Sequence, residues 1–437
     1  MRHWTSALVV AVTGLIAATG ASAQQHVLKM LVLSEDAPKV QKVAEAYQAK
    51  HPDVAIKMQS APWDQYFQTA ELRLNSKDKS VDLVYVDVPL IAGYASRGFL
   101  APVDPNLDTS ALVASSLNAG KYNGKLYALP INNSAQVLFY NKKLFADAGV
   151  TPPDGLTPGG TATQAQANEI ASSKRWTWEQ VAEAAQKLTQ KKGGKTAVWG
   201  FSFDQINELY QLQPLGESLG TDVISPDGKT AQGYLDSPAW VKGATFWSDL
   251  YNKWGVSPKG LSHDEPPQLF ANGQLALFAG GTWNLALFQK NGVDFGVAAF
   301  PYFQGGKALT PTGSWFIGVA ANSVNKDIAA DFAKFLTLSD EGTKMWFDAN
   351  KQLPAYKPLL EQISRSPEFD AFPQDVFRIG VYDALNTAKP RPTTVAYGQL
   401  QDAFRTAFAD MSNGVPVTDA LATAVETYDA AMKRVAQ

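Results

Sequence analysis

The sequence contains no cysteine among its 437 residues. Disulfide frameworks, zinc–thiolate sites, iron–sulfur clusters and thiol nucleophiles are therefore all excluded. Histidine is scarce as well, with four in the whole chain, and His26, His51 and His263 lie far apart in sequence. Because metal clusters and acid–base centres commonly depend on histidine, we expect this protein to use neither a metal nor a cofactor.

An excess of charge of either sign is also missing. The 38 lysines and arginines nearly balance 41 aspartates and glutamates, which gives a formal net charge of -3. Nucleic-acid binding normally needs a basic surface, so we expect no nucleic-acid partner. Gly193-Gly194-Lys195-Thr196 does not complete a phosphate-binding loop, because Thr189 stands where that motif needs its first glycine. We expect a simple turn there, between a helix and a strand.

Long hydrophobic runs are missing too. The run at residues 7–18 is shorter than the roughly 20 residues that cross a bilayer. Arg2 precedes this run and Ala21-Ser22-Ala23 follows it, which is the pattern of a secretory signal with a small-residue cleavage site. We therefore expect residues 1–23 to be a cleaved signal peptide. Since no cysteine is present for lipid attachment, we expect a freely diffusing periplasmic protein.

The rest of the chain alternates between strand and helix patterns, which predicts an α/β fold. Thr177 and Gln180 form a capping box that opens a helix. The segment at residues 151–173 is rich in Gly, Pro, Thr and Gln and shows no periodicity, so we expect an inserted or mobile loop. A helix is predicted where Val40, Val43, Ala44 and Tyr47 share one face. Strands are predicted at residues 27–33, 54–58, 80–88, 198–203, 275–278 and 295–300.

Seven segments, read in order, resemble family 1 of the extracellular solute-binding proteins, the group that includes maltose- and trehalose-binding proteins. The most specific are GKLYALP followed by an apolar strand and YNK, and FANGQLALFAGGTW. The segments are Tyr94 to Asp104, Gly124 to Gly149, Thr177 to Glu179, Phe270 to Asn284, Phe295 to Pro301, Gly313 to Ala320 and Asn325 to Leu336. Pro390-Arg391-Pro392 also resembles the disaccharide-binding branch of this family.

This resemblance implies a type II periplasmic binding protein fold, with a ligand cleft between two α/β lobes that are joined by crossing hinge strands. The first lobe would comprise residues 24–132 and 305–353, and the second residues 133–304 and 354–437. The chain would be a monomer without catalytic activity that closes around a disaccharide or small glycoside and delivers it to inner-membrane permease subunits of an ATP-driven importer. A secreted glycoside hydrolase and a lectin-like adhesin remain alternatives.

In the first lobe, candidate ligand contacts follow the carboxyl ends of predicted strands, where open α/β sheets bind ligands. Glu35 follows the first strand, Trp63 the second, and Asp87 lies at the end of the third, where the family often places an acid that binds hydroxyl groups. For Trp63 a partly exposed helix start is the alternative, and for Asp87 a solvated loop acid. Asn132 and Asn133 are either ligand contacts or hydrogen-bonding hinge residues. We expect Asp87→Ala to weaken binding without changing the unliganded fold.

Aromatic side chains could pack against the C–H faces of a sugar ring. Trp283 is the first candidate, because the two glycines at positions 280 and 281 would let its indole approach a ligand closely. Trp315 resembles the second aromatic position of the family, with core packing as the alternative. In contrast, Trp240, Trp247 and Trp346 lie in helical patterns and are expected in the core.

Four further residues complete the predicted site. Glu208 and Tyr210 follow the strand at residues 198–203 and could line the wall of the second lobe. Arg391 lies between two prolines, where the resemblance implies an arginine that binds sugar oxygens, although a surface arginine is the alternative. Tyr382 lies in the same late segment of the chain.

Overall fold

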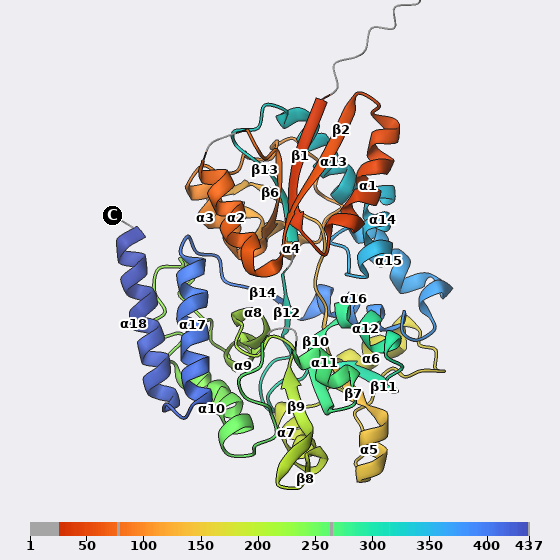
Figure 1. The fold of residues 1–437 in the computed structure, drawn as a ribbon, viewed down its shortest axis with the longest axis vertical. Coiled ribbons are helices and arrows are strands. Elements are labelled where there is room, and N and C mark those ends of the chain that lie inside the picture. The colour runs from red at the N-terminus through yellow and green to blue at the C-terminus, as the bar shows by residue number, and fades with distance from the viewer. Residues whose placement is uncertain (1–25, 77–78, 263–264, 314, 436–437) are drawn as a thin grey trace, which may run out of the picture.

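The computed structural model describes residues 26–76, 79–262, 265–313 and 315–435. Within these ranges the chain forms two lobes, each built around a five-stranded sheet and covered by helices (Figure 1). This arrangement confirms the predicted two-lobed α/β architecture. The predicted signal peptide with its cleavage site and His263 lie outside the described residues.

The sheet of the first lobe has the strand order β2-β1-β3-β13-β6, in which β1 runs parallel to β2 and β3 while β13 runs antiparallel to β3. Its strands are β1 (His26–Leu33), β2 (Val54–Ala61), β3 (Leu83–Asp87), β6 (Ala128–Pro130) and β13 (Trp315–Val319). The helices of this lobe are α1 (Ala37–Lys50), α2 (Trp63–Asn75), α3 (Ile91–Ser96), α4 (Ala114–Ala119), α13 (Lys326–Leu338) and α14 (Asp340–Asn350). A small hairpin joins β4 (Lys121–Tyr122) to β5 (Lys125–Leu126). The four predicted apolar positions of α1 are all buried.

The sheet of the second lobe has the strand order β11-β7-β10-β9-β8. Its strands are β7 (Gln136–Asn141), β8 (Gln190–Lys192), β9 (Lys195–Phe203), β10 (Leu275–Gly281) and β11 (Phe295–Ala299). Along β7, Val137 and Phe139 pack into one apolar core while Leu138 and Tyr140 pack into another. Because successive side chains of a strand point to opposite faces, this sheet must be covered on both sides.

Helices from distant parts of the chain provide that cover. The internal ones are α5 (Lys142–Ala148), α6 (Gln164–Ser173), α7 (Trp178–Leu188), α8 (Leu209–Leu212), α9 (Pro214–Glu217), α10 (Pro238–Asn252), α11 (Glu265–Ala271) and α12 (Leu285–Lys290). The C-terminal ones are α15 (Lys357–Arg365), α16 (Val376–Asn386), α17 (Tyr397–Ser412) and α18 (Val417–Val435). Trp240, Trp247 and Trp346 are buried, as predicted. Among the described helices, none is both long and apolar enough to cross a membrane.

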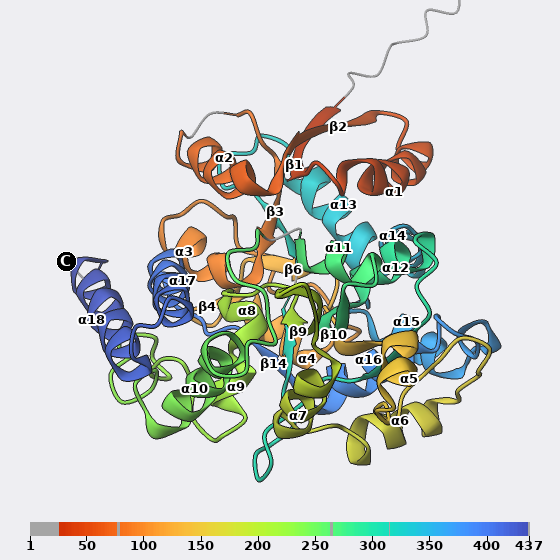
Figure 2. The same ribbon diagram turned by 60° about the horizontal axis from the view of Figure 1, so that its bottom comes forward.

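The chain passes between the two sheets after β6, after β11 and after α14. Near these crossings, β12 (Thr310–Thr312) pairs with β14 (Ala388–Pro390), and Asn132 bridges to Pro354. Both views place α17 close to α3 of the first lobe (Figures 1 and 2). The C-terminal helices therefore reach the space between the lobes, whereas the exact lobe limits stay a prediction.

Two local predictions were wrong. Residues 151–173 do not form a structureless loop, because their second half is helix α6, which a capping box between Thr163 and Gln166 opens. The same signal was recognised at Thr177, where the structure confirms it. The glycines at positions 193 and 194 join β8 to β9 rather than a helix to a strand, and both adopt the positive φ that such a tight hairpin turn needs.

Candidate functional site

A cavity of about 590 Å³ lies between the lobes. The first lobe contributes residues from α2, the end of β3, α3 and the start of β13. The second lobe and the C-terminal segment contribute residues near α8 and β10, the residue after β14, and one face of α17. This volume lies in the usual range for a small-molecule site.

Seven of the eleven predicted site residues line this cavity, although they are spread over more than 300 positions of the chain. They are Trp63, Asp87, Glu208, Tyr210, Trp283, Trp315 and Arg391. Glu35, Asn132, Asn133 and Tyr382 do not line it. The roles of all eleven residues in binding stay a prediction.

The wall formed by the first lobe is mainly aromatic. Trp315 packs nearly parallel to Phe67, with ring centroids 6.1 Å apart, and nearly perpendicular to Trp63 at 6.0 Å. Trp315 also lies directly opposite Asp87 in the antiparallel pairing of β13 with β3. Opposed residues of such a pair project from the same face of the sheet, so this register places an indole beside a carboxylate.

The wall formed by the second lobe contains the other predicted indole. Trp283 follows the end of β10 and lies 6.5 Å from the ring of Tyr210. A β-carbon at Gly281 would approach the Trp283 ring to 2.0 Å, so only glycine lets the indole fold over its own backbone there. Burial raises the pKa of Tyr210 to about 12, although nearby Arg391 acts in the opposite direction. Tyr210 therefore stays neutral near pH 7.

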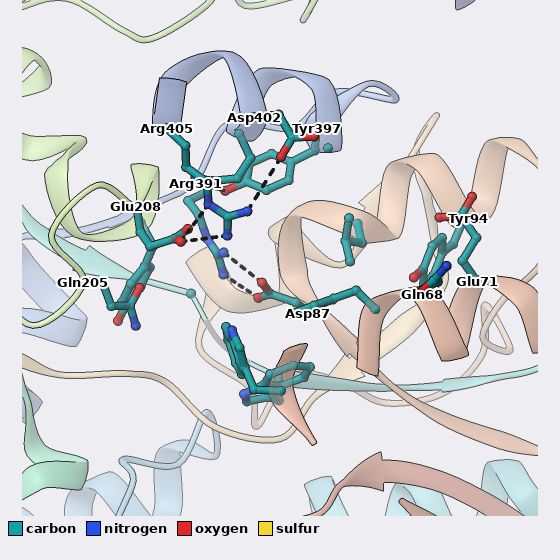
Figure 3. Close-up of a pocket in the computed structure, with 18 of the residues that line it drawn as sticks. Gln68, Glu71, Asp87, Tyr94, Gln205, Glu208, Arg391, Tyr397, Asp402 and Arg405 are labelled. Carbon is teal, nitrogen blue, oxygen red and sulfur yellow. Dashed lines mark hydrogen bonds and ion pairs between the residues drawn. The ribbon is translucent and has the colours of Figure 1, made fainter. Parts of the chain in front are cut away.

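Asp87 and Arg391 form a paired carboxylate and guanidinium at the centre of the site (Figure 3). Nη1 of Arg391 donates to Oδ2 of Asp87 at 2.8 Å, and Nη2 donates to Oδ1. The side chain of Arg391 is only 10% exposed and that of Asp87 only 12%. The guanidinium also lies over the rings of Tyr210 and Tyr397, at 5.0 and 5.7 Å from their centroids. Burial lowers the pKa of Arg391, but Asp87 and Tyr397 raise it more, so this side chain stays charged.

A second ion pair lies beside the first, within the second lobe and the C-terminal segment. Nε and Nη2 of Arg405 each lie 2.7 Å from Oε1 of Glu208. Asp402 lies on the other side of the same guanidinium, 3.7 Å from Nη1. Figure 3 shows that the Glu208–Arg405 and Asp87–Arg391 pairs occupy one side of the cavity, whereas Gln68, Glu71 and Tyr94 gather at the opposite side.

The four predicted residues outside the cavity have other surroundings. Glu35 is exposed beyond the end of β1. Asn132 is buried and its Oδ1 accepts from the backbone N–H of Trp315 at 3.2 Å, while Oδ1 of Asn133 accepts from Ser116 at 2.5 Å. These bonds favour the hinge alternative for both asparagines. Tyr382 lies on α16 and packs partly buried against the core of the second lobe.

Several lining residues were not predicted from the sequence. On α2 and α17 they recur at intervals of four, which places them on one face of each helix. That spacing was the available signal, but it does not say which face points into a cleft. The residues concerned are Phe67 and Glu71 on α2, and Tyr397, Gln401 and Arg405 on α17.

Among the described residues, no group of three or more histidines, aspartates or glutamates is arranged to hold a metal ion. The cavity instead offers aromatic faces from both lobes together with carboxylate, guanidinium, amide and hydroxyl groups. Flat apolar faces beside hydrogen-bonding groups match the two kinds of surface on a sugar ring.

Comparison with known proteins identifies the family of this chain. The family model described as bacterial extracellular solute-binding protein matches residues 33–343. A maltotriose-binding protein from Pyrococcus abyssi is 26% identical over 75% of this chain, and the match spans 65% of that relative, just under two thirds. A galactooligosaccharide-binding protein from Bacillus subtilis is 25% identical over 75% of this chain and 73% of its own length.

Solved structures show the same architecture. An ABC substrate-binding protein from Listeria monocytogenes, in complex with cycloalternan, has a TM-score of 0.78 and 24% identity, over 94% of this chain and 99% of that one. The GacH receptor of Streptomyces glaucescens, solved unliganded and with acarbose, has a TM-score of 0.75 and 22% identity over the same shares. These likenesses confirm the predicted two-lobed fold.

Proposed function

Because the chain belongs to the bacterial extracellular solute-binding protein family, we propose that it binds a carbohydrate in the cleft between its lobes and delivers it to the permease of an ATP-driven importer. The observation that carries this proposal is the cavity between the lobes, where Trp283 of one wall and Trp315 of the other flank a buried Asp87–Arg391 pair. Relatives named for maltotriose and for galactooligosaccharides agree with a saccharide ligand.

The proposal also has finer parts. We place the mature chain in the periplasm as a monomer without a nucleic-acid partner, and we assign it no catalysis. Asp87 and Glu208 are each engaged by an arginine. A glycoside hydrolase would instead need one of two facing carboxyl groups to give a proton to the glycosidic oxygen. This arrangement supports binding over hydrolysis.

The first test is the melting temperature of the mature protein against a panel of neutral mono-, di- and oligosaccharides, with amino acids and short peptides as a second panel. A ligand that binds only the folded state stabilises it by about 2.7 kcal/mol at a concentration of 100 times Kd. We expect at least one saccharide to raise the melting temperature and to be recovered unchanged. If amino acids or peptides raise it while every saccharide leaves it unchanged, the proposal is wrong; a saccharide recovered as hydrolysis products would favour a hydrolase.

The second test concerns closure of the two lobes. A ligand shifts an open–closed equilibrium only through its different affinity for the two forms, and a cavity with walls on both lobes binds best when they meet. We expect the radius of gyration from small-angle scattering to decrease when the saccharide identified above is added. An unchanged radius would favour a preformed, lectin-like site.

A further inference from the structure

Every charged side chain that lines the cavity already has a partner of opposite charge. Asp87 is paired with Arg391, Glu208 with Arg405, and Asp402 lies 3.7 Å from Arg405. The charged lining residues, among those the structure describes, are Glu71, Asp87, Glu208, Arg391, Asp402 and Arg405. Glu71, at the far side, is paired with Arg97 of the first lobe. Each charged lining group is therefore paired. Glu208 and Asp402 share Arg405, so four carboxylates face three guanidiniums and the set has a net charge of -1.

The two central pairs differ in how firmly they are fixed. Arg391 is buried between two tyrosine rings, and its bidentate contact with Asp87 leaves little freedom for either group. Arg405 is 42% exposed on α17, whereas Glu208, its partner just before α8, is 17% exposed. Removing the Glu208 carboxylate would therefore free the Arg405 guanidinium at the cavity wall without disturbing the buried Asp87–Arg391 pair.

Paired charges interact differently with neutral ligands and with charged ligands. A hydroxyl group can donate to a carboxylate or accept from a guanidinium while the ion pair stays intact. A ligand carboxylate, phosphate or ammonium would lose hydration and must either break a pair or lie beside one that is already neutralised. In this cavity the hydration that a charged ligand loses therefore costs more free energy than its contacts with the paired groups return.

We infer that the site selects uncharged saccharides over charged ones, and that Glu208 determines this selectivity by neutralising Arg405. The inference rests on the proposed carbohydrate function and adds the charge class of the ligand. Without the Glu208 carboxylate, Arg405 would keep only the distant and exposed Asp402, a weak partner. The freed guanidinium could then pair with a sugar carboxylate in a bidentate manner.

The experiment compares matched ligand pairs by isothermal titration calorimetry. Each pair is a neutral saccharide and its counterpart oxidised to a uronate at one terminal C6, with maltose, maltotriose, trehalose, cellobiose and galactobiose as the neutral members. For the neutral saccharide that binds most tightly, we expect wild-type protein to bind the uronate at least tenfold more weakly. In Glu208→Gln we expect this ratio to shift by tenfold or more toward the uronate, and high salt to reverse the gain.

Two variants serve as controls. Glu183→Gln makes the same chemical change in an exposed ion pair with Lys187 on α7, outside the cavity lining, and should leave the ratio at the wild-type value. Glu208→Gln combined with Arg405→Gln removes the freed guanidinium, so the gain in uronate binding should disappear. Circular dichroism confirms that each variant is folded.

The outcomes separate this inference from the proposed function. Wild-type protein that binds a uronate as tightly as its neutral counterpart, or a folded Glu208→Gln variant with an unchanged ratio, would overturn the inference while leaving carbohydrate binding in place. If no member of any pair binds, the carbohydrate proposal is overturned, and the inference with it.

Discussion

The two walls of the cleft are built from different chemistry. The wall of the first lobe is an aromatic surface, in which Trp63, Phe67 and Trp315 pack together and Asp87 is the central polar group. The opposite wall has one prominent indole, Trp283, and Arg405 paired with Glu208. The Asp87–Arg391 pair, at the centre, joins the two sides.

Neither wall is a complete sugar site by itself. The first offers more aromatic surface, whereas the second offers more charged and hydrogen-bonding groups. A sugar ring needs both kinds of contact at once. A ligand therefore binds most tightly when both lobes contact it, which is the physical reason to expect the lobes to close around it.

The largest effect on stability and binding should come from removing Asp87, one member of the charged pair that joins the walls. Asp87→Ala leaves the guanidinium of Arg391 buried and unpaired, and breaking a buried pair from one side costs about 3 to 5 kcal/mol. We now expect this variant to lose stability even without ligand, unlike the expectation from the sequence alone, and to lose sugar binding. Urea unfolding and calorimetric titration measure the two losses.

The matched control for Asp87→Ala removes both charges. Asp87→Ala combined with Arg391→Met should recover part of the stability but not the binding, because no unpaired charge remains. A urea midpoint for Asp87→Ala equal to that of the wild type would show that the pair does not join the walls in solution.

Behind the second wall, Glu217 is a buried carboxyl group that lacks the kind of partner Asp87 has. Oε2 of Glu217 has no hydrogen-bond partner among the described residues, and Lys389 bonds to Asp222 instead. Burial raises the pKa of Glu217 to about 8, with Lys389 acting to lower it and Asp222 to raise it. Glu217 is therefore neutral in the folded state near pH 7.

This raised pKa predicts a loss of stability with rising pH. The unfolded chain releases the Glu217 proton at its ordinary, lower pKa, so the folded state weakens from about pH 5 and the loss is complete above about pH 8. Glu217→Gln should remove this loss, with a difference of a few kcal/mol, since one pKa unit corresponds to about 1.4 kcal/mol. Urea unfolding from pH 5 to 9 checks this, with exposed Glu426→Gln as the control. Parallel pH profiles of Glu217→Gln and wild type would contradict it.

Removing an indole from either wall should have a smaller but clear effect on binding. Trp283→Ala and Trp315→Ala should each weaken sugar binding by about 1.5 to 3 kcal/mol, or roughly ten- to hundredfold, because each removes one apolar face. We also expect ligand to change the intrinsic tryptophan fluorescence, and Trp283→Ala to remove most of that change. If one variant binds like the wild type while folded, that wall does not contact the ligand.

The smallest effect is expected at the rim of the first wall. Glu71 and Arg97 form an exposed pair, with side chains 50% and 43% accessible, and such pairs contribute at most about 1 kcal/mol. Glu71→Gln should therefore change sugar affinity by less than about fivefold. A loss as large as that of an indole would mean that the ligand extends along α2 to this rim.

Several site residues could be predicted from the sequence because strand ends are local features. Asp87 ends a buried strand, and Trp283 and Trp315 each follow glycines, so their positions could be read from short motifs. Helix α6 was missed because its Ala-rich inner face, with Ala167 and Ala171, gives a weak apolar signal.

The partners of the charged groups could not be predicted. Glu208 meets Arg405 across 197 positions and Asp87 meets Arg391 across 304, and no local pattern links such distant residues. The contribution of α17 was missed for the same reason. Which face of this helix borders the cleft depends on how it packs between the lobes, and that is a property of the whole fold.

The most direct test of this account is a crystal structure of the mature protein with the saccharide that stabilises it most. We expect a sugar in the cavity between the lobes, with one ring face on Trp283, another on Trp315, and hydroxyl groups bonded to Asp87 or Arg391. A sugar bound to only one lobe, or outside this cavity, would contradict it.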